Sequence, residues 1–186
     1  MNYEVATVID SFWGNIFRQE GEEENIRSIL RKIPIFEGLS RKELAAVERI
    51  LNHRQYKNGE TIFRHDDPAG GMYIIIKGKV QVVFEPTQQV IAELYDGNFF
   101  GELALIDESP RSATVIAKMD SKILGFFQSD FLDLIDRNPK LGVKIAMRLL
   151  TVIGARLNKS NEQVQALQLK LYNLQQKRRR SKSESS

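Results

Sequence analysis

Cysteine is absent from the 186 residues of this chain, and histidine occurs only twice. Without cysteine, a disulfide framework, a thiolate metal site and a thiol nucleophile are all excluded. The two histidines, His53 and His65, lack the paired spacing of a zinc site. The sequence also has no nucleophile motif and no glycine-rich phosphate loop of the Walker type. We therefore expect a protein that is not an enzyme and that has no metal or other cofactor.

Long apolar runs are missing as well, since no stretch reaches the roughly 20 consecutive apolar residues that a membrane-spanning helix needs. The N-terminus lacks the basic start of a signal peptide, and residues 20–24 are acid-rich. With 42% hydrophobic and 27% charged residues, the chain can bury one medium-sized core. These features predict a cytoplasmic protein with no transmembrane segment, built from one domain with extensions.

The positive charge is concentrated at the C-terminus. The net charge is +3, but residues 177–186 alone carry +4, which leaves −1 for the other 176 residues. We predict that this segment is a basic, disordered tail. Such runs are usually solvated, and the alternative is an electrostatic, sequence-independent contact with nucleic acid or acidic lipid.

Two helical patterns open the chain. Apolar residues spaced three and four apart over 1–20 predict an amphipathic helix. It would pack on its own domain or on a dimer partner, or dock on another protein or a membrane surface. A second helix is expected over about 22–32, before Pro34. Ser40 and Glu43 have the spacing of a capping box, which predicts a helix from there to about Leu51.

From Tyr56 the period changes to that of β-strands. Short β-branched or aromatic runs alternate with turn residues such as Asn58-Gly59 and Asp96-Gly97. The expected strands are 61–64, 72–77, 79–84, 90–95, 114–117 and 123–127. Many short strands at this spacing indicate an antiparallel β-barrel or jelly roll, so the helices and strands together predict an α+β fold.

A long helix is predicted after the strands. Ser129-Asp130 is expected to cap a first helix, and Asn138-Pro139 to end it and begin a longer one. Two sets of mostly apolar residues then repeat every seven positions: Val143, Leu150, Leu157, Val164 and Leu171, and Ala146, Ile153, Ser160, Leu167 and Leu174. This rhythm is typical of a coiled coil, and we interpret it as a parallel homodimer. A single helix packed on its own barrel would explain only the first half of the pattern.

Residues 99–115 place a glycine turn, a one-turn helix and a lone arginine between two strands. Their sequence is Phe-Phe-Gly-Glu-Leu-Ala-Leu-Ile-Asp-Glu-Ser-Pro-Arg-Ser-Ala-Thr-Val. Gly101 lets the backbone come close to a ligand. The amides of Leu103, Ala104 and Leu105 would open a short helix, where unpaired N–H groups favour a phosphate. Arg111 can add a forked, permanently charged donor to the same phosphate.

Glu102 and Ser112 complete the candidate site. An ionised Glu102 can only accept hydrogen bonds, so a sugar hydroxyl is its natural partner, and the Ser112 hydroxyl could donate to the phosphate. Each residue also has a plainer interpretation. Arg111 could be a surface arginine after a proline turn, Glu102 a helix cap, and Ser112 a turn or strand residue.

Three further segments accompany this loop: Ile-Pro-Ile-Phe-Glu-Gly-Leu-Ser at 33–40, Tyr-Lys-Asn-Gly-Glu-Thr-Ile-Phe at 56–63 and Met-Tyr-Ile-Ile-Ile-Lys-Gly-Lys-Val at 72–80. In order and spacing, roughly residues 30–160 resemble the cyclic nucleotide-binding domain family, which includes the sensor domains of bacterial catabolite activators and of protein kinase A regulatory subunits. The resemblance implies a jelly-roll barrel flanked by N-terminal helices and a long dimerisation helix. We divide the chain accordingly into a helical arm (1–32), the barrel domain (33–137), the long helix (138–176) and the basic tail (177–186).

The resemblance also implies roles for single residues in binding a cyclic nucleotide. Ser160 would contact the base in its own subunit and Asn161 the base bound by the partner, with a register uncertain by one helical turn. Ser160 could instead set the register of a coiled coil. A serine after the arginine, as at Ser112, resembles the bacterial cyclic AMP receptors, so we favour cyclic AMP over cyclic GMP as the ligand.

The function implied by the resemblance is that of a dimeric cyclic nucleotide sensor whose helices rearrange and are recognised by an unknown downstream protein. The alternatives are a transcription regulator of the catabolite-activator type, a sensor of cyclic GMP or cyclic dinucleotides, and a structural module that binds nothing. A compact DNA-binding domain needs on the order of 60 residues, and only about ten follow the long helix, so we expect no sequence-specific DNA binding. The intact Gly101, Glu102, Arg111 and Ser112 argue against the structural module.

Overall fold

The computed structural model describes residues 26–183, with side-chain exposure up to residue 175. The chain divides into two compact units, the first ending at Arg148 and the second beginning at Leu149. The expected helix over 1–20 lies outside the described residues, and the described part of the next helix is helical at 26–30. No helix in the described part of the chain is long and apolar enough to cross a membrane.

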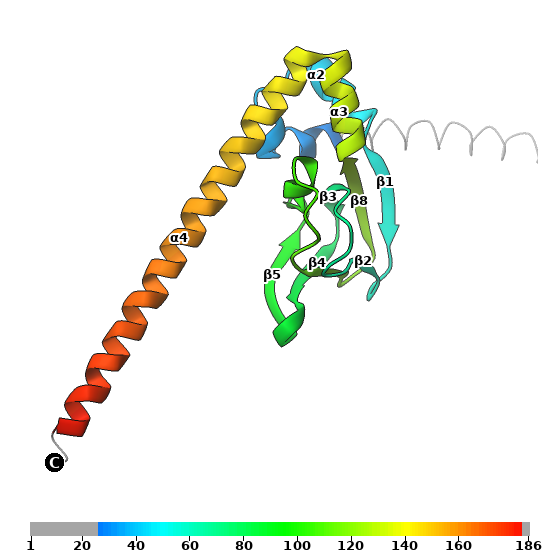
Figure 1. The fold of residues 1–186 in the computed structure, drawn as a ribbon. Helices are drawn as coiled ribbons and strands as arrows, with labels where there is room; N and C mark the ends of the chain where they lie inside the picture. Colours follow the sequence, from blue (N-terminus) through cyan, green and yellow to red (C-terminus); the bar gives the residue numbers. More distant parts are fainter. Residues whose placement is uncertain (1–25, 184–186) are drawn as a thin grey trace, which may run out of the picture. The chain divides into compact units, whose positions relative to one another are not determined.

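Eight strands within residues 26–183 form two four-stranded antiparallel sheets in the first unit (Figure 1). The first sheet has the order β1(Asn52–Tyr56), β8(Ser121–Phe127), β3(Gly71–Lys77), β6(Phe99–Phe100). The second has the order β2(Thr61–Phe63), β7(Thr114–Ala117), β4(Lys79–Phe84), β5(Gln89–Tyr95). Buried residues from both sheets share one core cluster: Ile75, Val80, Phe100, Val115 and Ile123. The antiparallel β fold predicted from the sequence is confirmed.

All six expected strands are present, with ends that differ from the prediction by two residues at most. Strands β1 and β6 were missed. Four of the five β1 residues are exposed, so β1 has no alternation of apolar and polar side chains to reveal it. It is a strand because it pairs with β8, from Asn52 opposite Gly125 to Tyr56 opposite Ser121.

Helix α2(Arg41–Glu48) begins as predicted, because the amide of Ser40 donates to Glu43 Oε2 at 2.7 Å and the amide of Glu43 donates to Ser40 Oγ at 3.3 Å. It ends at Glu48 rather than near Leu51. A 3₁₀ turn, η1(Pro34–Phe36), precedes it, and a second, η2(Glu85–Thr87), joins β4 to β5. Glu43 also pairs with Lys144 at 2.6 Å, which ties α2 to the first turns of the last helix.

Helix α3(Gln128–Arg137) does not have the predicted cap. Strand β8 passes directly into it at Phe127, whose extended backbone makes the transition with no side-chain hydrogen bond. Ser129 and Asp130 therefore lie within the first turn, where Asp130 Oδ2 accepts a hydrogen bond from Asn52 Nδ2 at 3.2 Å. Asn138 ends the helix as expected, and Pro139 begins the next.

Helix α4(Pro139–Ser183) contains 45 residues and runs past the expected boundary at residue 176. Residues 177–183 are thus helical in the structure and not an irregular tail, because Lys and Arg are good helix formers and no glycine or proline interrupts them. In the second unit, large apolar side chains of α4 are exposed: Leu150, Leu157, Val164, Leu167, Leu171, Tyr172 and Leu174. An exposed apolar repeat on one helix is the pattern of a surface that another helix covers.

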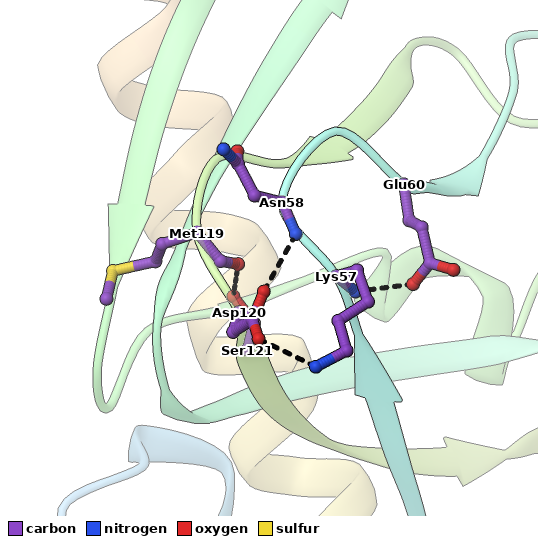
Figure 2. A network of polar contacts seen from close by, with 6 residues as sticks. All are labelled: Lys57, Asn58, Glu60, Met119, Asp120 and Ser121. Atoms are coloured by element: carbon purple, nitrogen blue, oxygen red, sulfur yellow. Dashed lines mark hydrogen bonds and ion pairs between the residues drawn. The ribbon is translucent and has the colours of Figure 1, made fainter.

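The turns between β1 and β2 and between β7 and β8 are held together by a polar network (Figure 2). Asp120 accepts from Lys57 Nζ at 2.8 Å and from the amide of Asn58 at 3.1 Å. Glu60 accepts from the amide of Lys57, and Ser121 Oγ donates to the carbonyl of Met119 at 2.8 Å. Because one carboxylate connects both turns, it fixes the strand pairs at this end of the sheets.

Candidate ligand-binding site

Arg111 lies just before β7 and turns inward, so that only 7% of its surface is exposed. Its Nη2 donates to the carbonyl of Gly71 at 2.7 Å, and its Nη1 approaches the carbonyl of Gly101 at 3.4 Å. The guanidinium carbon lies 4.2 Å from the ring centre of Phe63 and 5.7 Å from that of Tyr73. The cation is therefore held by two carbonyls and two aromatic rings, which orient it without neutralising its charge.

No carboxylate among the described residues forms an ion pair with Arg111, and its Nε is buried without a hydrogen-bond partner there. Burial lowers the pKa of Arg111 from its usual value, although an arginine side chain remains protonated in proteins. An unpaired charge and an unsatisfied donor are costly inside a protein. Arg111 is therefore not a surface arginine after a proline turn, because its guanidinium is buried and its Nε lacks a partner among the described residues.

The backbone of Arg111 is fixed by the segment that follows β2. Its amide donates to the carbonyl of Asp67 and its carbonyl accepts from the amide of Asp66, both at 2.9 Å. Asp66 has a positive φ of 64°, and Asp67 Oδ2 accepts from the amide of Arg64 at 2.6 Å. This tight turn positions the arginine, although 43 residues of sequence lie between Asp67 and Arg111.

Gly101 begins the short 3₁₀ helix η3(Glu102–Leu105) with a left-handed φ of 73°. A β-carbon at this position would lie 2.7 Å from Arg111 Nη1, so the arginine occupies the space that any other residue would need. The amide of Ala104 donates to the carbonyl of Gly101 at 3.1 Å. The sequence predicted that this amide would be unpaired, but the 3₁₀ geometry, with its shorter hydrogen-bonded ring, already uses it.

The other predicted site residues of the first unit differ from one another in burial. Glu102 is 5% exposed, whereas the side chains of Leu103 and Ser112 are exposed beside it and beside Arg111 in the chain. Of the predicted site residues, Gly101 is the one whose approach to Arg111 the described contacts show.

Ser160 and Asn161 belong to the second unit, where both are exposed on α4. Their predicted contacts with a base remain predictions.

The aromatic residues around Arg111 were not predicted as part of the site. Phe63, Tyr73 and Phe100 form a cluster in which the rings of Tyr73 and Phe100 are stacked with centres 5.5 Å apart. The ring centre of Phe63 lies 5.7 Å from that of Tyr73 and 5.8 Å from that of Phe100. The sequence placed these residues in or beside expected strands, but it gave no signal that the strands converge on one arginine.

The described residues contain no group of three or more His, Cys, Asp or Glu side chains that could hold a metal ion. His65, which lies near the site in the chain, forms a close contact with the neighbouring Asp66 at 3.1 Å.

Known proteins match this chain over the same region. Residues 53–138 match the model of the cyclic nucleotide-binding domain. The "cyclic AMP receptor protein" of Thermus thermophilus is 31% identical over 72% of this chain and 62% of the relative. A "putative potassium channel protein" of Rhodopseudomonas palustris is 33% identical over 70% of this chain and 32% of the relative. The chain thus spans less than two thirds of the length of these curated relatives.

Solved structures agree with this assignment. The crystal structure of the Thermus thermophilus catabolite activator protein superposes with a TM-score of 0.65 and 31% identity, covering 72% of this chain and 62% of that one. The regulatory domain of Toxoplasma gondii protein kinase A, solved with cyclic AMP, gives a TM-score of 0.57 and 26% identity, covering 61% of this chain and 44% of that one. Together with the two sheets, these similarities show that residues 53–138 belong to the cyclic nucleotide-binding domain family.

Proposed function

We propose that this chain is a cyclic AMP sensor that regulates a partner protein. The observation that carries the proposal is the buried Arg111, which has an unsatisfied Nε and no carboxylate partner among the described residues. A cyclic phosphate supplies the missing acceptor and the missing charge together. The relatives' names support the choice of ligand, since one is a cyclic AMP receptor and another was solved with cyclic AMP.

The roles of the other residues follow from their chemistry. In this proposal the Ser112 hydroxyl, which is exposed next to Arg111 in the chain, and the backbone of Gly101 and Leu103 serve the phosphate. Ala104 contributes only to the shape of the turn, because its amide already donates to the carbonyl of Gly101. Glu102 accepts a hydrogen bond from the ribose hydroxyl, because an ionised carboxylate can only accept hydrogen bonds. In this proposal Ser160 contacts the base in its own subunit, and Asn161 contacts the base bound by the partner.

We propose a parallel homodimer formed through α4. The exposed apolar residues from Leu150 to Leu174 recur at heptad spacing, as in a two-stranded coiled coil. Ligand then shifts the arrangement of the helices through its differential affinity for two states. The division into arm (1–32), barrel (33–137), long helix (138–176) and basic segment (177–186) describes the parts of this device.

In this proposal the protein is cytoplasmic, and the partner that receives the signal is another protein. The 186 residues themselves do not read a DNA sequence. The relatives support a regulatory role. They include a receptor protein, a channel protein and a kinase regulatory domain, so the process that is regulated differs among them.

Calorimetry with cyclic AMP, cyclic GMP and cyclic dinucleotides tests the ligand. We expect one site per chain and the tightest binding for cyclic AMP. Arg111→Ala should weaken binding by roughly 2–5 kcal/mol, the usual loss when one partner of a buried charge pair is removed. Arg137→Ala is the matched control, because the Arg137 side chain is 83% exposed in a surface ion pair with Asp133. Equal affinity of the Arg111→Ala variant and the control would refute the site, and tighter binding of cyclic GMP would correct the ligand.

A further inference from the structure

A cavity of about 550 Å³ lies at the other end of β3 from the candidate site. Arg111 contacts the carbonyl of Gly71, the first residue of β3, whereas the cavity is lined by Ile76 and Lys77 at its last residues. Gly71 and Lys77 are six positions apart along an extended strand, a distance of roughly 20 Å. None of residues 99–112 lines this cavity. The cavity is therefore separate from the candidate site, although both belong to the first unit.

The cavity has an apolar floor. Three isoleucines from two elements contribute to it: Ile26 and Ile29 of the helical segment at 26–30, and Ile76 of β3. Pockets for small organic molecules have this composition, with an apolar lining and a few polar groups, and volumes of roughly 300–1,000 Å³.

Cations surround this floor. Lys32, Arg54, Lys77 and Lys122 all line the cavity, and all four are exposed. Among the described residues, Lys32, Arg54 and Lys77 take part in no ion pair. Some exposed cations of the first unit are paired, such as Lys57 with Asp120 at 2.8 Å and Arg148 with Glu37 at 3.1 Å.

One carboxylate, that of Asp96, is present in the lining, and His53 is the remaining titratable group there. Asp96 Oδ1 already accepts a hydrogen bond from the amide of Gly78 at 2.7 Å, which ties this carboxylate to the turn between β3 and β4. Lys32, Arg54 and Lys77, which form no ion pair among the described residues, outnumber this engaged carboxylate and produce a positive potential, and a concave apolar wall strengthens it.

We propose that this cavity is a second ligand site, which binds a small amphipathic organic anion. The apolar or aromatic body of the ligand lies on the isoleucine floor, and its carboxylate, sulfonate or phosphate group meets Lys32, Arg54, Lys77 and Lys122. The site does not depend on the proposed cyclic nucleotide function, because it shares no residue with the Arg111 site.

The probe for the test is 8-anilinonaphthalene-1-sulfonate, an aromatic sulfonate that fluoresces when it leaves water. We would titrate it into the full chain in saturating cyclic AMP, and also into the Arg111→Ala variant. We expect one probe per chain, bound equally in both cases, with affinity that falls as salt is raised. Sodium sulfate at matched ionic strength should not displace the probe more than sodium chloride does, because the apolar body supplies part of the binding.

The double variant Lys32→Glu/Lys77→Glu should raise the Kd of the probe at least tenfold. The matched control Lys118→Glu/Lys140→Glu changes two exposed lysines outside the cavity by the same total charge, and it should leave the Kd within twofold. Equal losses in both double variants would overturn the proposal, as would displacement of the probe by cyclic AMP. If the Glu variant unfolds by circular dichroism, Lys32→Gln/Lys77→Gln replaces it, and an unchanged Kd there would also overturn the proposal.

Discussion

Gly101 and Arg111 occupy complementary space: the position of a β-carbon on Gly101 lies 2.7 Å from Arg111 Nη1. The glycine therefore serves two purposes, since its φ of 73° opens η3 and its missing side chain admits the guanidinium. The glycine that starts the short helix and the arginine that packs against it therefore cannot be varied separately.

Gly101→Ala should separate these two effects when it is compared with Gly59→Ala. Gly59 also has a positive φ, 87°, but nothing lies within 4 Å of its β-carbon position. Both variants should lose roughly 1–2 kcal/mol of folding stability, the cost of a left-handed alanine. The Gly101 variant alone should also lose cyclic AMP affinity, because Arg111 must move. Chemical denaturation and calorimetry measure the two quantities, and unchanged affinity in Gly101→Ala would contradict this interpretation.

Phe63→Leu should weaken cyclic AMP binding by roughly 0.5–2 kcal/mol, the usual range for a cation–π contact from exposed to desolvated sites. The ring of Phe63 holds the guanidinium of Arg111 at 4.2 Å, and leucine keeps the apolar volume while removing the ring. Phe84→Leu is the control, since Phe84 is an exposed phenylalanine on the same sheet. The measurement is isothermal calorimetry, and equal affinities in the two variants would show that the ring does not position Arg111.

Truncation after Asn161 should weaken dimerisation and leave the barrel folded. It removes Val164, Leu167, Leu171 and Leu174, which are more than half of the apolar repeat that is exposed on α4. Sedimentation equilibrium of the full chain and of the truncated chain measures the effect, with circular dichroism to follow the β-sheets. A full chain that is monomeric at tens of micromolar would contradict the proposed coiled coil.

Acid should destabilise the first unit partly through Glu43. Hydrogen bonds from Lys144 and from Ser40 lower the pKa of Glu43 from 4.5 to about 2. A lowered pKa in the folded state means that the stabilisation is complete above pH 4.5 and is lost as the pH falls from there to about 2. Because the pair is partly exposed, we expect a contribution of no more than roughly 1 kcal/mol.

Glu43→Gln isolates the charge, because glutamine preserves the capping box. Its stability should fall below that of the original chain at pH 7 and should approach it near pH 2. Urea unfolding at a series of pH values measures this difference, which should narrow only below pH 4.5. A constant difference at all pH values would show that the effect is not electrostatic.

Removal of residues 177–186 should abolish any binding to random duplex DNA or to anionic vesicles. Such contacts depend on the five basic residues of this segment and should weaken steeply with salt. Titration of the full chain and of a version that ends at Gln176, each at two salt concentrations, measures the effect. Binding that survives the truncation, or that discriminates between DNA sequences, would favour the transcription-regulator alternative.

The strands of the barrel could be predicted because each had its own local pattern of β-branched residues and turn signals. Strand β1 could not, since its Asn-His-Arg-Gln-Tyr sequence is exposed and its pairing with β8 spans about 70 residues. The capping box at Ser40 was predicted from a local spacing and is present. In contrast, the cap predicted for α3 at Ser129-Asp130 is not present. Strand β8 runs directly into α3, and the extended backbone of Phe127 precedes the helix without a side-chain hydrogen bond.

In the candidate site too, local features could be predicted from the sequence and long-range contacts could not. The glycine turn, the short helix and the arginine are neighbours in the sequence, so their combination could be recognised there. The carbonyl of Gly71 and the rings of Phe63 and Tyr73 come from strands 30 to 50 residues away, and their approach to Arg111 depends on sheet register. Sequence patterns report which residues carry chemistry, whereas long-range pairing decides what surrounds them.

The unpaired burial of Arg111 has a consequence for the lifetime of the chain. A ligand that binds only the folded state adds stability, roughly 2.7 kcal/mol at a concentration one hundred times its Kd. Proteases that cut transiently opened chains depend on the population of the open form. In a chain that binds cyclic AMP through Arg111, saturating ligand would reduce that population about a hundredfold. The abundance of this protein would then itself follow the level of the nucleotide, because the unliganded molecules are degraded first.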